Sequence, residues 1–179
     1  FSLSAAAVAD INVARLFLMP VALCGTAWSN LHRPQISAWA SKKKFPKIRV
    51  LILRSIIFGV GMLCIFTALL TWGYPYLEEL LGPSYRGLLP LVLLWSLYFA
   101  VGLPRTILMA TLMTEPAGYK KLQRVSLIAL FISLSGLFLL SGKGAAWVVG
   151  VLIAVELVQL VLIAMNAVWW WQPKRNVYE

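Results

Sequence analysis

The stretch VLILRSIIFGVGMLCIFTALLTW, residues 50–72, decides the fold. It has 23 predominantly apolar residues, and Arg54 is the one charged residue among them. A helix needs about 20 such residues to cross the hydrocarbon core of a bilayer. The stretch is therefore predicted to be a transmembrane helix.

Four more apolar segments flank this one, at about residues 5–28, 88–113, 125–141 and 145–171. The composition agrees with about five spans: 61% of the residues are hydrophobic, 12% are charged, and the mean hydropathy is +0.84. A soluble domain carries roughly twice that charged fraction. We therefore expect residues 1–179 to form one all-α, polytopic transmembrane bundle. Because the chain begins at Phe1 with no charged region before the first apolar run, we interpret it as a fragment.

The basic residues between the segments predict an orientation. If residues 29–49 are cytoplasmic, eleven Lys and Arg residues lie on that side and two, Arg86 and Lys143, lie on the other. The eleven are Arg33, Lys42, Lys43, Lys44, Lys47, Arg49, Lys120, Lys121, Arg124, Lys174 and Arg175. The positive-inside rule then places the C-terminus in the cytoplasm. Because these charges lie between spans, the net charge of +10 does not indicate nucleic acid as a partner.

The sequence offers no conventional catalytic set. His32 is the one histidine, Asp10 is the one aspartate, and no Walker A sequence occurs. Cys24 and Cys64 lie in apolar surroundings, so they indicate neither a disulfide framework nor a metal site. We therefore expect a protein that is not an enzyme and has no catalytic residue, metal or cofactor.

Four charged residues inside the apolar segments give the strongest functional signal: Asp10, Arg15, Arg105 and Glu156. A charge at the centre of a bilayer costs from about 2.5 kcal/mol to far more, so such residues usually face a cavity or a partner. Spacings of three and seven residues return to one helical face. The residues that share a face in this way are Asn12 with Arg15, Tyr98 with Arg105, and Gln159 with Glu156.

These patterns predict two sets of site residues. Arg15, Arg105, Asn12 and Tyr98 are expected to line a substrate cavity. Asp10, Glu156 and Gln159 are candidates either for ion coupling or for a structural ion pair, in which Glu156 could bind Arg15 or Arg105. An ion pair between Asp10 and Arg15 is not expected, because five residues separate them on the helix.

Two prolines are predicted to disturb helices beside these charges. Pro104 has no N–H, so the carbonyl of Ala100 loses its helical partner and a kink is expected. Pro20 has the same effect on Leu16, next to Arg15. Kinked helices beside polar groups are common where transporter spans line a wet cavity. Small residues at 102, 106, 110 and 114 predict close packing of another helix.

The order of the segments resembles the C-terminal part of a polysaccharide flippase. A span closes on a proline in SNLHRPQISAWASKKK, residues 29–44, and a basic linker and an apolar span follow. A short outer segment, LLGPSYRGLLPLVLLW, residues 80–95, leads into the next span. In this pattern the chain is similar to the O-antigen and exopolysaccharide (lipid-linked oligosaccharide) flippases of the multidrug/oligosaccharidyl-lipid/polysaccharide exporter superfamily.

The resemblance implies a two-lobed transporter of the bacterial inner membrane, of which this chain is the C-terminal lobe. Its substrate would be an undecaprenyl-pyrophosphate-linked oligosaccharide, flipped by alternating access for cell-surface polysaccharide biosynthesis such as that of lipopolysaccharide. Its partners would be this substrate, membrane lipids and other polysaccharide-assembly proteins. Arg15 and Arg105 would then contact the pyrophosphate, because a guanidinium presents a fork of donors to such an anion.

Three other functions remain open at this point. An ion-coupled multidrug antiporter of the same superfamily would use Glu156 or Asp10 as its central carboxylate. A membrane-embedded ligase or polymerase of lipid-linked glycans would need a larger extracytoplasmic loop than the segments leave. In a membrane scaffold without transport, all four buried charges would be structural.

Overall fold

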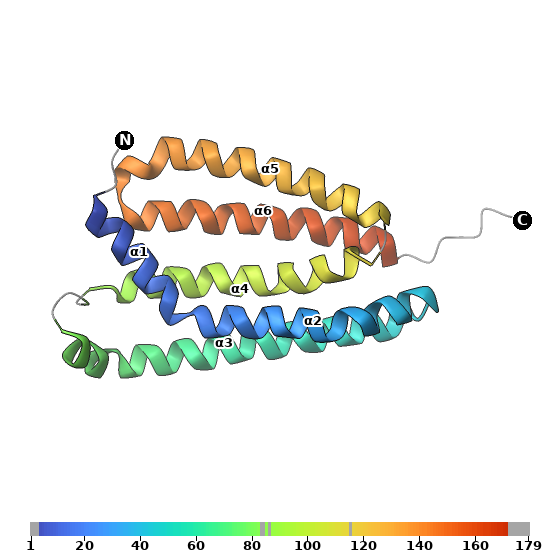
Figure 1. The fold of residues 1–179 in the computed structure, drawn as a ribbon, viewed down its shortest axis with the longest axis horizontal. Coiled ribbons are helices and arrows are strands. Elements are labelled where there is room, and N and C mark those ends of the chain that lie inside the picture. Colours follow the sequence, from blue (N-terminus) through green and yellow to red (C-terminus); the bar gives the residue numbers. More distant parts are fainter. Residues whose placement is uncertain (1–3, 83–84, 86, 115, 172–179) are drawn as a thin grey trace, which may run out of the picture.

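The computed structural model describes residues 4–82, 85, 87–114 and 116–171, and within them the chain is helical and contains no strand (Figure 1). The α-helices of this part are α1 (Ala5–Phe17), α2 (Met19–Ser41), α3 (Phe45–Leu81), α4 (Leu89–Leu112), α5 (Pro116–Leu140) and α6 (Ala145–Trp171). A 3₁₀ turn, η2 (Ser141–Lys143), lies between α5 and α6. The all-α bundle predicted from the sequence is confirmed.

Within the described residues, α3, α4, α5 and α6 are each long and apolar enough to cross a membrane. Helices α1 and α2 pass the same test only together, as a pair bent by 54°. Counting this pair as one span gives five, which agrees with the number predicted. α2 to α6 lie roughly lengthwise beside one another, whereas α1 crosses them at an angle (Figure 1).

The bend between α1 and α2 lies beside Pro20, as the sequence predicted. The N–H of Leu18 donates to the carbonyl of Arg15 at 3.0 Å, which closes α1. Helix α2 begins at Met19, so Pro20 lies in its first turn, where a missing N–H breaks no helical bond. The side chain of Leu18 is fully buried and anchors the bend in the core. Pro104, in contrast, lies inside an α4 that continues unbroken to Leu112.

Several helices extend beyond their apolar segments. Residues 29–41, expected to form part of a polar linker, continue α2, and the connection to α3 consists of residues 42–44. At its other end α3 continues through Pro75 to Leu81, beyond the apolar segment of residues 50–72. Tyr74 near this end is buried, and its hydroxyl donates to the carbonyl of Tyr85 at 2.7 Å. The tyrosine thus ties α3 to the connection before α4.

Helix α4 is at the centre of the bundle. It packs against α1, α2, α3, α5 and α6, and it has the largest buried share of the four single spans. Two apolar clusters surround it. Near its N-terminal end, Val92 and Trp95 pack with Leu18 and Val149. Near its C-terminal end the cluster comprises Ile36, Ile48, Ile52, Ile107, Leu108, Leu112, Leu122, Val125, Ile163 and Ala167.

Two glycines allow close approaches between helices on the α5 side. A Cβ on Gly118 would lie 1.9 Å from the carbonyl oxygen of Leu112, so the short connection between α4 and α5 requires glycine there. A Cβ on Gly136 would lie 2.7 Å from a methyl group of Val151, which brings α5 against α6. Helices α3 and α5 are the least buried spans and expose many large apolar side chains. These side chains suit contact with lipid.

Candidate functional site

Three of the residues predicted from the sequence meet between α4 and α6. The Arg105 guanidinium forms an ion pair with Glu156, with Nε 2.5 Å from Oε2. The Tyr98 hydroxyl donates to the other oxygen, Oε1, at 2.9 Å. Each oxygen of the carboxylate therefore contacts one side chain of α4. Of the two partners that the sequence left open for Glu156, the structure selects Arg105 and excludes Arg15.

Helical spacing explains why these groups converge. Tyr98 and Arg105 are seven residues apart and so lie on one face of α4. Gly102 lies between them on this face, and a Cβ there would be 3.8 Å from Glu156 Oε2. The absence of a side chain at Gly102 leaves room for the carboxylate. Thr106 then donates its hydroxyl to the carbonyl of Gly102 at 2.9 Å, so it needs no partner on α6.

The ion pair is more deeply buried on its acidic side. Glu156 is 6% exposed, whereas the side chain of Arg105 is 24% exposed. Arginine has five N–H donors. Nε contacts Glu156, and Nη1 contacts only the sulfur of Met109, at 3.9 Å. Among the described residues, the terminal amino groups of Arg105 have no oxygen acceptor, so they remain available to an anion.

A small cavity lies beside the ion pair, between α2, α4 and α6. Its volume is about 150 Å³. Its lining residues are Ala22, Gly25, Thr26, Tyr98, Phe99, Gly102, Leu103, Arg105, Thr106 and Glu156. A cavity of this volume has room for water or for one small charged group, but it is below the range of about 300–1,000 Å³ typical of small-molecule sites.

Arg15 lies in a different environment. It is exposed, and its guanidinium carbon lies 5.8 Å from the centre of the Trp95 ring, within the range of a cation–π contact. Trp95 also donates its indole N–H to the carbonyl of Ile11 at 3.1 Å, which fixes α1 on α4. Among the described residues Arg15 has no carboxylate partner.

Arg15 and Arg105 do not share one pocket. Arg15 contacts Trp95, and Trp95 and Arg105 are ten residues apart on α4, or about 15 Å along the helix axis. Aromatic rings span this distance in part, because the Trp95 and Tyr98 rings meet edge to face with their centres 5.0 Å apart. A continuous series of contacts therefore leads from Arg15 through Trp95 and Tyr98 to Glu156 and Arg105. Trp95 was not predicted as a site residue, because an aromatic residue in an apolar span resembles a core residue.

The other predicted residues lie outside this series. Asn12 is exposed on α1, and Asp10 and Gln159 are half-buried. Within the described part of the chain, none of the three forms a hydrogen bond or an ion pair with another side chain. As expected, Asp10 does not pair with Arg15. Asn166, which shares the stripe of Glu156 and Gln159, donates to the carbonyl of Leu162 on its own helix at 2.7 Å.

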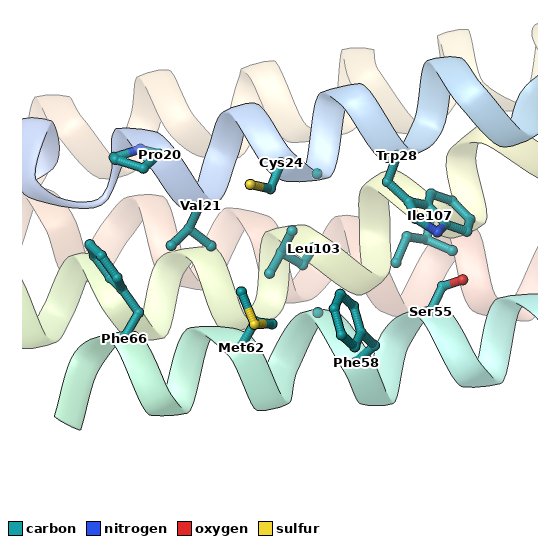
Figure 2. Close-up of a pocket in the computed structure, with 12 residues that line it drawn as sticks. Pro20, Val21, Cys24, Trp28, Ser55, Phe58, Met62, Phe66, Leu103 and Ile107 are labelled. Carbon is teal, nitrogen blue, oxygen red and sulfur yellow. The ribbon is translucent and has the colours of Figure 1, made fainter. Parts of the chain in front are cut away.

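A second cavity lies beside the first, between α2, α3 and α4, and its volume is about 220 Å³ (Figure 2). Gly25 and Leu103 line both cavities. A Cβ on Gly25 would lie 2.7 Å from Leu103 Cδ2, so these two residues form a thin wall between the two spaces. The second cavity is almost entirely apolar: the hydroxyl of Ser55 donates to the carbonyl of Leu51 at 2.6 Å.

Comparisons of the chain with protein-family models, with curated proteins and with solved structures find no match. The resemblance to the flippases therefore rests on the order and spacing of segments in the sequence.

Proposed function

We propose that this chain is part of a flippase that moves an undecaprenyl-pyrophosphate-linked oligosaccharide across the bacterial inner membrane. The observation that supports this proposal is the state of Arg105: it is held inside the bundle by Glu156, yet its terminal amino groups have no oxygen acceptor among the described residues. A phosphate group binds such a donor fork well. The cavity beside Arg105 supplies the space for it.

In this mechanism Glu156 and the substrate phosphate compete for one guanidinium. Without substrate, Arg105 is neutralised by Glu156, so the bundle does not carry an unpaired charge in hydrocarbon. When the phosphate binds, Arg105 turns toward it, and Glu156 keeps the hydrogen bond from Tyr98. When Arg105 exchanges Glu156 for the phosphate, substrate binding weakens the contact between α4 and α6. These two helices would then move relative to each other in alternating access.

The size of the cavity limits what this site can hold. At about 150 Å³ it can accept a phosphate group but not the glycan. The glycan would therefore pass along a path that includes parts of the transporter beyond these helices. Arg15, which contacts Trp95 ten residues before Arg105 on α4, would contact the anion at a different stage of its movement.

The test is complementation of a flippase-null strain by the intact protein. Arg105→Gln is expected to abolish surface polysaccharide while the protein remains folded in the membrane, because the phosphate loses its donors. Arg124→Gln removes an exposed arginine of α5 and is the matched control. Normal surface polysaccharide with Arg105→Gln would refute the role of this residue.

An ion-coupled multidrug antiporter of the same superfamily is the second candidate, and the burial of Glu156 favours it. A buried carboxylate beside a cavity can bind and release a proton or a small cation. The two functions differ in the charge they require. Antiport needs the carboxylate, so Glu156→Gln would abolish drug export. Flipping needs the guanidinium, so Glu156→Gln would retain part of the transport and Arg105→Gln would retain none.

A further inference from the structure

We propose that the apolar cavity between α2, α3 and α4 binds one acyl chain of an anionic diacyl phospholipid, whose phosphate pairs with Arg54. This site is separate from the Arg105 cavity, and the proposal does not depend on which molecule the protein transports. It rests on the lining of the cavity, its length, its opening and the charge at one of its ends.

The lining excludes a polar ligand. Ten of the residues around the cavity are drawn and labelled in Figure 2: Pro20, Val21, Cys24, Trp28, Ser55, Phe58, Met62, Phe66, Leu103 and Ile107. Gly25 and Gly59 complete it. The Ser55 hydroxyl donates its hydrogen within its own helix. The Trp28 indole N–H is then the one side-chain O–H or N–H group in the lining that could donate to a ligand. An apolar cavity of about 150 Å³ already binds a molecule as large as benzene, and this one holds about 220 Å³.

The lining of the cavity is about as long as one leaflet is thick. Its lining on α3 runs from Ser55 to Phe66, which is twelve residues or about 16 Å along the helix. Half of a hydrocarbon core that is about 30 Å thick is about 15 Å. The lining is centred on the predicted span of residues 50–72, so an acyl chain that enters from the basic end of α3 lies along its first half, from Ser55 to about Gly61.

The cavity opens on the outer surface of the bundle. Phe58 is 68% exposed and Met62 is 49% exposed, and Cys24 faces them from α2 as another exposed residue (Figure 2). In a bilayer this opening faces lipid, so the phase that can fill it consists of acyl chains. If the cavity stayed empty, the side chains that line it would lose dispersion contacts that an acyl chain can supply.

The charge at one end selects the kind of lipid. Arg54 is exposed and lies four residues before Phe58 and eight before Met62, on the same face of α3. Helical side chains point toward the N-terminus of their helix, which places the guanidinium toward the basic end of α3 with Lys47 and Arg49. Among the described residues Arg54 has no acceptor. A phosphate at this level neutralises it while an acyl chain extends along Phe58 and Met62.

The experiment is photo-crosslinking in proteoliposomes that contain the intact protein. The probe is phosphatidylglycerol with a diazirine in one acyl chain, and peptide mass spectrometry locates the adducts. We expect adducts in residues 20–28 and 55–66, well above those on the exposed apolar face of α5. Adducts spread evenly over α3 and α5 would overturn the proposal, because they would indicate only annular lipid.

Two glycines of α3 give a matched pair of variants. Gly59→Leu fills the cavity, since a Cβ there would lie at an ordinary contact distance of 3.8 Å from Leu103. Gly61→Leu adds the same side chain at a residue that does not line the cavity and whose Cβ would have no neighbour within 4 Å. Gly59→Leu should remove the adducts and Gly61→Leu should keep them. Equal labelling of the two folded variants would contradict the proposal.

Further probes test the head group and the chain. Arg54→Gln should lower the labelling by phosphatidylglycerol about fivefold, because one arginine near an anionic lipid head group strengthens binding by about that factor. Arg124→Gln should leave the labelling unchanged. Phosphatidylcholine with the same diazirine chain should label as weakly in the parent as phosphatidylglycerol does in Arg54→Gln. A polyprenyl phosphate probe that labels these residues where the diacyl probe does not would overturn the assignment to a phospholipid.

Discussion

At the residue scale, the pair formed by Arg105 and Glu156 sets a cost for every change made to one partner alone. Arg105→Met leaves a carboxylate that is 6% exposed without its counter-charge. Breaking a buried pair from one side typically costs about 3–5 kcal/mol, whereas replacing both partners by apolar residues is often neutral. We expect Arg105→Met to lower the unfolding free energy by about 3 kcal/mol and the double change with Glu156→Met to recover most of it.

Denaturant titration in detergent, followed by circular dichroism, measures this difference. Glu156→Gln is the accompanying control, because the amide oxygen can still accept from Arg105 while the amide NH2 donates to the Tyr98 hydroxyl oxygen, so it should cost less than Arg105→Met. Additive losses in the double variant would mean that the two side chains do not interact.

Trp95 supports a second prediction at this scale. Trp95→Phe removes the indole N–H that donates to Ile11 and weakens the contact with Arg15. A net hydrogen bond contributes about 1 kcal/mol, so α1 should detach from α4 about fivefold more often. Hydrogen exchange of the α1 amides measures this detachment. Trp72→Phe, at a tryptophan that is 77% exposed on α3, should leave the exchange unchanged.

How much of the site could be predicted at this scale depended on helical spacing. Spacing within α4 placed Tyr98, Gly102 and Arg105 on one face, and the structure shows them together around Glu156. Spacing cannot tell which helices face each other, so the sequence could not choose between Arg15 and Arg105 as the partner of Glu156. Nor could it show that Arg15 lies exposed beside Trp95.

At the element scale, the connection between α4 and α5 depends on Gly118. Gly118→Ala places a Cβ 1.9 Å from the carbonyl of Leu112, so the backbone must move. Overpacking of this kind costs about 1–3 kcal/mol, and we expect thermal unfolding to shift down accordingly. Gly61→Ala adds the same methyl group in open space within α3 and should stabilise the helix by up to about 1 kcal/mol. A neutral Gly118→Ala would mean that the connection can relax.

The lengths of the helices were the least predictable feature at this scale. Hydropathy finds the part of a helix that lies in hydrocarbon, but a helix can continue into water as long as its backbone bonds are kept. For this reason α3 begins at Phe45 and ends at Leu81, beyond both ends of residues 50–72. The bend at Leu18 was predictable because proline acts through local geometry, without reference to any other helix.

At the scale of the whole molecule, the basic connections are sorted by the ends of the bundle. The α2–α3 connection, residues 42–44, and the start of α5 lie at one end, and η2 lies at the other (Figure 1). The former end carries Lys42, Lys43, Lys44, Lys120 and Lys121, and the latter carries Lys143. The basic residues on which the positive-inside rule depends are therefore separated in the folded bundle as well as along the sequence.

This segregation makes orientation testable with single cysteines. In a background in which Cys24 and Cys64 are replaced by alanine, Lys43→Cys and Lys120→Cys should react with a membrane-impermeant maleimide only after the membrane is opened. Lys143→Cys should react in intact cells, because η2 lies at the opposite end of the bundle. The reverse pattern would refute the orientation while leaving the fold intact. Labelling of Lys43→Cys and Lys143→Cys from the same side would refute a bundle whose helices cross the bilayer lengthwise, and with it a role for Arg105 in moving an anion from one leaflet to the other.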